Sequence, residues 1–157
     1  MNKEELLNKV APCSLMCHTC SGYCDGKIKT LAAELLHYQS GLEEFLCLHA
    51  GDAMGKRFRS YEDMLRFSAG AACPGCRQGG KKGSCIEGCM ISTCTKAHDV
   101  DFCGQCAEFP CNKLDKVFEP QVLRQWVEGS AFIRDHGIEA FWEEYHRKSH
   151  YRAYKEE

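Results

Sequence analysis

The cysteines are the residues of this sequence whose types and spacing can do chemistry. Thirteen of the 157 residues are cysteines, and eight of them lie from Cys73 to Cys111, where two C-x-x-C pairs occur, Cys73 with Cys76 and Cys103 with Cys106. A C-x-x-C pair on a tight turn directs two sulfur atoms to one point, as a tetrahedral metal site requires. Further cysteines lie between and after these pairs. The stretch from Cys73 to Cys111 therefore predicts metal binding.

Cys103, Cys106 and Cys111 form the best-defined set of ligands. Cys111 ends the segment E-F-P-C, directly before a predicted helix, where backbone N–H groups and the helix dipole favour a thiolate. Cys94 is the expected fourth ligand. His98 competes for that position, but a site so rich in thiols favours a fourth cysteine. We therefore interpret His98 as a solvated loop histidine.

The remaining cysteines of the centre and those near the N-terminus are less clearly paired. Cys73 and Cys76 need two more ligands; Cys89 is the nearest good candidate, and Cys85 is either its partner or a spare thiol. Near the N-terminus, four more cysteines are close enough in sequence to share a site. They are Cys13, Cys17, Cys20 and Cys24.

The first three of these N-terminal cysteines have the C-x-x-x-C-x-x-C spacing that holds a 4Fe–4S cluster in radical SAM enzymes. Two observations argue against such an enzyme. Thr19 stands where an aromatic residue usually precedes the last cysteine, and no alternation of strands and helices follows. Cys24 could also close the fourth coordination position, which those enzymes leave open.

Eleven cysteines are thus predicted metal ligands, and zinc is the expected cofactor. They are Cys13, Cys17, Cys20, Cys24, Cys73, Cys76, Cys89, Cys94, Cys103, Cys106 and Cys111. A 4Fe–4S cluster is the alternative, because four thiolates serve either group and spacing does not separate them. Cys47 stands between Leu46 and Leu48, so it is predicted to be a thiol of the hydrophobic core.

Charge and composition exclude several classes of protein. The formal net charge is −2, and thiolate-bound zinc makes the loaded protein more acidic, which argues against a general nucleic-acid binder. The N-terminal sequence is charged and resembles no signal peptide, and no apolar run reaches membrane length. We therefore expect a cytoplasmic protein. In that reducing compartment, dense cysteines indicate metal rather than disulfides, as the odd number of cysteines also does.

Apolar periodicity predicts a mainly α-helical single domain, 1–157, around an irregular, metal-stapled centre. Its parts are an N-terminal cysteine group with helices (1–72), the cysteine-rich metal-binding centre (73–111) and C-terminal helices (112–157). The predicted helices cover 2–10, 27–39, 42–48, 60–69, 112–118, 120–136 and 138–145.

Particular residues suggest where several of these helices begin and end. Asp25 is expected to cap the second helix, and Ser60 the fourth, after a loop over 51–59. Gly137 should end the long helix and allow a C-terminal helical hairpin, in which Trp126 packs with Trp142. The tail that follows should fray.

The motifs together resemble an uncharacterised prokaryotic family, the domain-of-unknown-function family numbered 3795. The resemblance rests on C-x-x-x-C-x-x-C near the N-terminus, C-P-G-C-R, F-C-x-x-C and E-F-P-C. It implies zinc binding through ten of the cysteines, with Cys24, Cys47 and Cys85 as extras, and it implies no reaction.

These observations predict a zinc-binding protein with structural metal sites that acts by binding a partner, for which another protein is the expected class. The alternative is an iron–sulfur protein for electron transfer or redox sensing. An enzyme is less well supported, because no set of His, Asp or Glu residues suits a general base beside a nucleophile.

Overall fold

The computed structural model describes residues 1–78, 86 and 89–155. Cys85 and most of the glycine- and lysine-rich segment lie outside the described residues. The described chain is mainly helical, as predicted, and its only β pairings are isolated bridges. Six α-helices are present there: α1 (Lys3–Lys9), α2 (Lys27–Tyr38), α3 (Leu42–Ala50), α4 (Asp52–Ala69), α5 (Ile91–Ala97) and α6 (Pro120–Tyr145).

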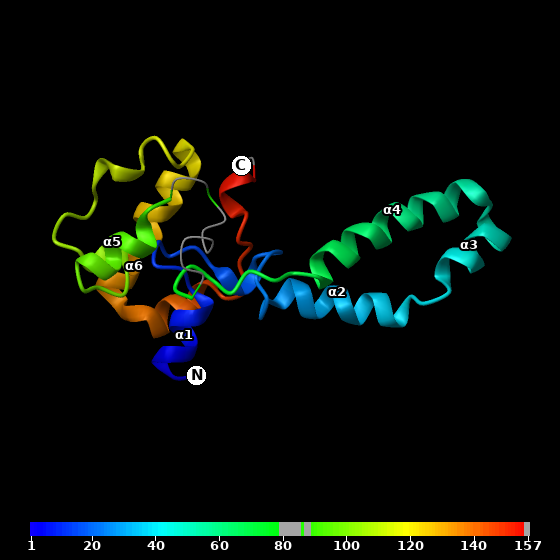
Figure 1. Cartoon of the computed structure of the whole chain (residues 1–157), viewed down its shortest axis with the longest axis horizontal. Helices are drawn as coiled ribbons and strands as arrows, with labels where there is room; N and C mark the ends of the chain where they lie inside the picture. Colours follow the sequence, from blue (N-terminus) through cyan, green and yellow to red (C-terminus); the bar gives the residue numbers. More distant parts are fainter. Residues whose placement is uncertain (79–85, 87–88, 156–157) are drawn as a thin grey trace.

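The chain forms two parts, which we call the body and the arm (Figure 1). The arm consists of α2, α3 and α4, which leave the body and return to it as a long helical projection. The body holds both termini, the other helices and the cysteine-rich segments. Four short 3-10 turns in the body bend the chain around the cysteines. They are η1 (Cys17–Thr19), η3 (Cys103–Gln105), η4 (Asn112–Leu114) and η5 (Arg152–Tyr154).

The C-terminal helix α6 begins with Pro120 in its first turn and is broken at Gly137, both as predicted. Gly137 has φ of 84° and ψ of 168°, a left-handed conformation that glycine adopts without a Cβ penalty. The chain bends back there, so that the ring of Phe132 contacts the rings of Phe141 and Tyr145.

Two hydrophobic clusters stabilise the body. The first joins α1 to the end of α6: Leu6, Val10, Met16, Phe102, Ile133, Ile138, Phe141 and Trp142. The second lies among the cysteines: Ala11, Cys13, Leu15, Ile91, Leu114, Phe118, Val122 and Trp126. Trp126 and Trp142 therefore lie in different clusters, and the prediction that they pack together is wrong. The bend at Gly137 turns their segments toward different neighbours.

The predicted loop at 51–59 is also wrong, because α4 begins at Asp52. Ser60 is consequently no helix cap; its hydroxyl donates to the Lys56 carbonyl inside α4. Gly55 is tolerated within this helix because α3 packs closely there: a Cβ on Gly55 would lie 2.2 Å from the Cys47 sulfur.

Two further local predictions fail for identifiable reasons. The helix α2 begins after Gly26 without a side-chain cap, since Asp25 forms an ion pair with Lys9 instead. The centre was expected to be irregular, yet it contains α5, whose buried Ile91 and Thr95 are spaced four residues apart. Short polar residues and cysteines between them obscure this period in the sequence.

Candidate metal centre

Four of the predicted ligands line one small cavity, which we call the four-cysteine cavity. They are Cys94, Cys103, Cys106 and Cys111, the set that the sequence grouped together. Cys94 comes from α5, Cys103 begins η3, Cys106 directly follows η3, and Cys111 directly precedes η4. The N–H of Cys106 donates to the carbonyl of Cys103 at 3.0 Å, which closes a tight knuckle between the two cysteines.

The four-cysteine cavity is apolar and small, at about 30 Å³. Burial raises the pKa of the Cys103 thiol to about 11. The nearby side chain of Trp126 acts in the opposite direction and lowers this pKa, but by less than burial raises it. The buried indole N–H of Trp126 has no acceptor in hydrogen-bond geometry within the described chain. A thiolate sulfur held in this cavity is a suitable acceptor, because hydrogen bonds to ligand atoms support metal sites.

Glycine is required where η3 meets α6. A Cβ on Gly104 would lie 2.0 Å from the backbone oxygen of Ser130, a separation that no side chain can occupy. The absence of a side chain lets the Cys103–Cys106 knuckle rest directly on the backbone of α6. The local sequence thus fixes where the two sulfur atoms lie.

The second cavity, which we call the six-cysteine cavity, has a volume of about 60 Å³. The N-terminal cysteine group and the first C-x-x-C pair meet here: Cys13, Cys17, Cys20, Cys73, Cys76 and Cys89. In the sequence these cysteines form two separate groups, because no local signal shows that the helices between them, from Lys27 to Ala69, form an arm that returns to its starting point.

Backbone contacts bring the two ends of the arm together beside the six-cysteine cavity. Tyr23 and Cys73 form a parallel bridge, in which the Cys73 N–H donates to the carbonyl of Gly22 and the Cys24 N–H donates to that of Cys73, each at 2.9 Å. Gly75, with φ of 88°, allows the tight turn between Cys73 and Cys76.

His150 also lines the six-cysteine cavity, and the sequence analysis missed it. Its Nδ1 lies 2.9 Å from the Met16 carbonyl, so Nδ1 donates a proton and Nε2 keeps its lone pair in the neutral ring. Burial lowers the pKa of this histidine, which favours that neutral form. The only signal in the sequence was a histidine in a tail expected to fray.

The C-terminal tail is docked rather than frayed. The hydroxyl of Thr19 donates to the Lys148 carbonyl at 2.9 Å. The N–H of Ser21 donates to the hydroxyl of Tyr151, whose oxygen lies 3.7 Å from the sulfur of Cys20. These contacts hold His150 against the cavity.

The remaining candidates lie outside the two cavities or at their edge. Cys24 is exposed and lines neither cavity. Cys47 is half-buried between α3 and α4, in the arm, so it belongs to neither core cluster of the body. His98 is exposed at the rim of the four-cysteine cavity. A further histidine, His18, lies between Cys17 and Cys20 in the sequence, and its ring contacts that of Trp142.

The two cavities gather thiols without bringing them into a coordination geometry. Among residues 1–78, 86 and 89–155, no three Cys, His, Asp or Glu side chains converge closely enough to hold a metal ion. The donors are nevertheless those that zinc prefers. A water molecule occupies about 30 Å³ of liquid, so cavities of this size suit an ion better than an organic cofactor.

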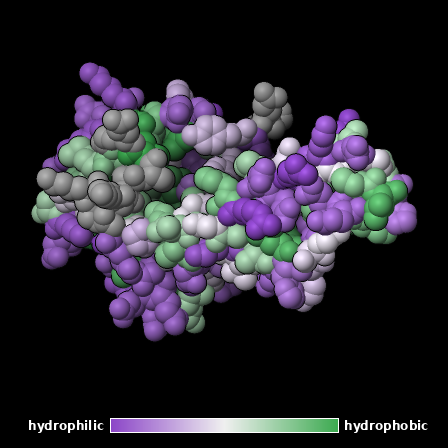
Figure 2. Space-filling view, turned by 45° about the vertical axis from the view of Figure 1, so that its right-hand side comes forward, coloured by the Kyte–Doolittle hydropathy of each residue, from purple (hydrophilic) through white to green (hydrophobic). Residues whose placement is uncertain are grey.

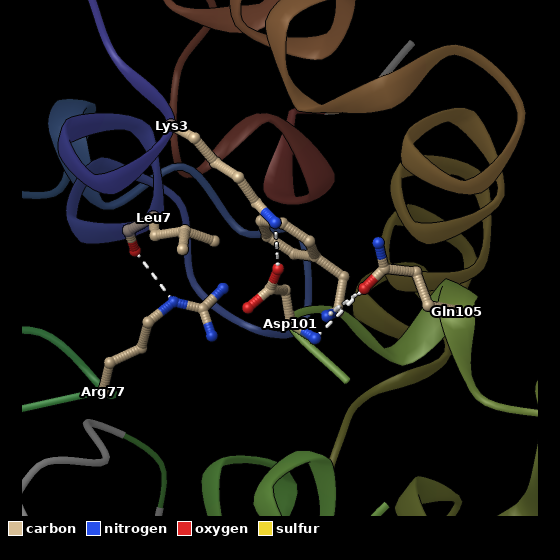
Figure 3. Close-up of polar contacts among 6 residues, drawn as sticks. Lys3, Leu7, Arg77, Asp101 and Gln105 are labelled. Carbon is tan, nitrogen blue, oxygen red and sulfur yellow. Dashed lines mark hydrogen bonds and ion pairs between the residues drawn. The ribbon is translucent and has the colours of Figure 1, made fainter. Parts of the chain in front are cut away.

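A group of polar contacts links both cavities to α1 (Figure 3). The guanidinium Nε of Arg77 donates a hydrogen bond to the Leu7 carbonyl at 2.9 Å. The carboxylate of Asp101 forms an ion pair with Lys3, with 2.7 Å between Oδ2 and Nζ. The Gln105 side-chain oxygen accepts the backbone N–H groups of Asp101 and Phe102. Arg77 follows Cys76, and Phe102 precedes Cys103, so these contacts position one cysteine of each cavity.

Comparison with known proteins gives one match. No curated protein and no solved structure shows significant similarity to the chain. Separately, no helix among the described residues has the length and apolar character to cross a membrane. The sequence profile of the proteins of unknown function named DUF3795 matches residues 9–116, a range that includes every cysteine of both cavities. The chain therefore belongs to the DUF3795 family.

Proposed function

We propose that this protein is a cytoplasmic zinc-binding protein in which cysteine-ligated zinc stabilises the body, while the helical arm binds a partner. The observation that carries the proposal is that ten cysteines, distant in sequence, line two cavities in or beside one apolar cluster. Thiols so concentrated in a reducing compartment indicate metal ligation.

The proposed ligands of one site are the cysteines of the four-cysteine cavity. The six-cysteine cavity supplies the second set, with Nε2 of His150 as a nitrogen donor. Its Nδ1–H bond to a backbone carbonyl is the arrangement that orients histidine ligands in metal sites. Cys24, Cys47 and Cys85 belong to neither proposed set.

A structural role for zinc agrees with the energetics of such a body. Structural zinc contributes on the order of 10–16 kcal/mol of apparent binding free energy, whereas whole domains are stable by about 5–15 kcal/mol. Among the described residues of 73–111, only Ile91 and Phe102 are large apolar side chains that are buried. Metal–thiolate bonds would supply what this small core lacks.

Elemental analysis of protein purified without oxygen tests the proposal. We expect two or three zinc ions per chain, since ten cysteines and one histidine fill two four-ligand sites, and a third ion would need a thiolate shared between two ions. An iron–sulfur protein would instead contain iron with acid-labile sulfide and would absorb at about 400 nm. Protein purified without any bound metal would also contradict the proposal.

A further inference from the structure

Seven metal donors line the six-cysteine cavity, more than one tetrahedral zinc ion can bind. Besides the six cysteines, His150 lines this cavity, and its Nδ1 bond to the Met16 carbonyl leaves Nε2 to bind a metal. Hydrophilic side chains cover much of the body's surface in Figure 2, whereas the cavity is also lined by Ala11, Leu15 and Phe118. Thiolates in such apolar surroundings need a counter-charge, which one zinc ion supplies to four ligands only.

Two pairs of cysteines with C-x-x-C spacing account for a first ion. They are Cys17 with Cys20 and Cys73 with Cys76. The N–H of Cys20 donates to the carbonyl of Cys17 at 2.9 Å, which closes a tight knuckle. Gly75 provides the turn of the other pair, and the bridge between Tyr23 and Cys73 joins the segments that carry the two pairs. Two such pairs are the usual ligands of a four-thiolate zinc site.

Three donors of the cavity remain after this first set. They are Cys13, Cys89 and His150. Cys13 is buried, at 5% exposed, and burial raises the pKa of its thiol well above the usual value. The nearby thiols of Cys76 and Cys89 raise the same pKa further, so these two side chains are neighbours of Cys13. Three donors leave a tetrahedral ion one ligand short of four.

Cys76 is the cysteine best placed to complete this second set. It belongs to the first set, yet among the cysteines it has the largest effect on Cys13. A thiolate sulfur is a soft donor with lone pairs for more than one ion. One sulfur atom can therefore serve both sets.

Arg77, which follows Cys76, provides a positive charge beside these thiols. Six thiolates and two zinc ions would carry a net charge of about −2. Burial lowers the pKa of Arg77, but a guanidinium remains charged at neutral pH. Arg77 lines one narrow cleft with Cys17 and Cys76, and its Nη2 is buried without an acceptor within the described chain. Charged N–H groups stabilise thiolate ligands, so this nitrogen is available to a shared sulfur.

We infer that the six-cysteine cavity holds two zinc ions that share the thiolate of Cys76. One ion also binds Cys17, Cys20 and Cys73, and the other also binds Cys13, Cys89 and Nε2 of His150. This inference rests on the proposed function, because it takes zinc as the bound metal, and it selects three rather than two ions per chain. The cavity volumes agree with it, at about 60 Å³ for the six-cysteine cavity and about 30 Å³ for the four-cysteine cavity.

NMR of the full-length chain loaded with the NMR-active isotope of cadmium, which replaces zinc in thiolate sites, tests the inference. We expect three cadmium resonances, two of which couple to each other. The Hβ protons of Cys76 should couple to both of these, and those of Cys103 only to the third. Cys106→Ala should lose the third resonance and keep the coupled pair. Cys47→Ala is the matched control and should keep all three, because Cys47 lines neither cavity.

Two results would overturn the inference. Two uncoupled resonances would leave Cys13 and Cys89 as thiols of the core. Three resonances without a Cys76 signal coupled to two of them would remove Cys76 as the shared ligand. Metal analysis of the protein as purified separates this inference from the proposed function. Two zinc ions per chain would contradict only the inference, whereas iron or no metal would contradict both.

Discussion

The guanidinium carbon of Arg77 lies 4.8 Å from the centre of the Phe102 ring. These two residues are neighbours of Cys76 and Cys103, so the contact joins the six-cysteine cavity to the four-cysteine cavity. The same guanidinium donates to the Leu7 carbonyl on α1. One partly buried side chain thus holds three segments that are far apart in the sequence.

We predict that Arg77→Ala destabilises the zinc-loaded protein by about 2–3 kcal/mol, because it removes a cation–π contact and a charged hydrogen bond. Chemical denaturation measures this free energy of unfolding. Arg124→Ala, on the outer part of α6, is the control and should change it by less than about 0.5 kcal/mol. Equal effects of the two substitutions would show that Arg77 does not link the cavities.

Gly104 provides a second test of how the knuckle is positioned. An added methyl group would meet the Ser130 backbone, so Gly104→Ala should cost about 3 kcal/mol or more and weaken metal retention. Glu143→Ala is the control, because Glu143 is exposed on α6 and lines neither cavity. Competition with a chelator would show whether zinc is released earlier from the Gly104 variant only. Release at the same chelator concentration in both variants would contradict the packing argument.

Substitution of Cys47 tests which cysteines are metal ligands and which are not. It lies in the arm beside Gly55 and lines neither cavity, so Cys47→Ala should leave the number of zinc ions per chain unchanged. Cys106→Ala should lower that number or release the metal at lower chelator concentration. Loss of one zinc ion from the Cys47 variant would show that the arm contributes a ligand.

His150 tests the composition of the six-cysteine site. Its substitution by alanine should weaken binding of one metal ion by at least about tenfold, while the four-cysteine site keeps its zinc. In the cobalt-substituted protein, the wild type should show the visible spectrum of a site with mixed nitrogen and sulfur ligands. The His150 variant should lose the features that depend on the nitrogen ligand. His136→Ala, on α6, should change neither the affinity nor the spectrum. Identical spectra for the His150 variant and the wild type would remove His150 from the ligand set.

The sequence was most informative where local geometry decides the structure. Pro120 and Gly137 mark the start and the break of the C-terminal helix because their backbones favour those conformations. Cys94, Cys103, Cys106 and Cys111 could be grouped from the sequence because they are close in the chain. The structure agrees, since all four line one cavity.

Long-range relationships could not be predicted in the same way. Leu31, Leu35 and Tyr38 recur at helical spacing on α2, yet their side chains are exposed. Apolar periodicity predicts a helix, but it does not say what covers the apolar face. The meeting of the N-terminal cysteines with Cys73 depends on the return of the arm to the body. The role of His150 depends on a docked tail, which no local pattern indicated.

The most direct test of the account compares hydrogen exchange in zinc-loaded and zinc-stripped protein. The central claim is that metal stabilises the cysteine-rich segments. Amides in 73–78 and 89–111 should lose protection together when zinc is removed, since their cluster depends on the cysteines. Amides of α1 and of the end of α6 should keep more protection, because their cluster contains no cysteine. Equal protection of 89–111 with and without zinc would contradict the claim that the metal is structural.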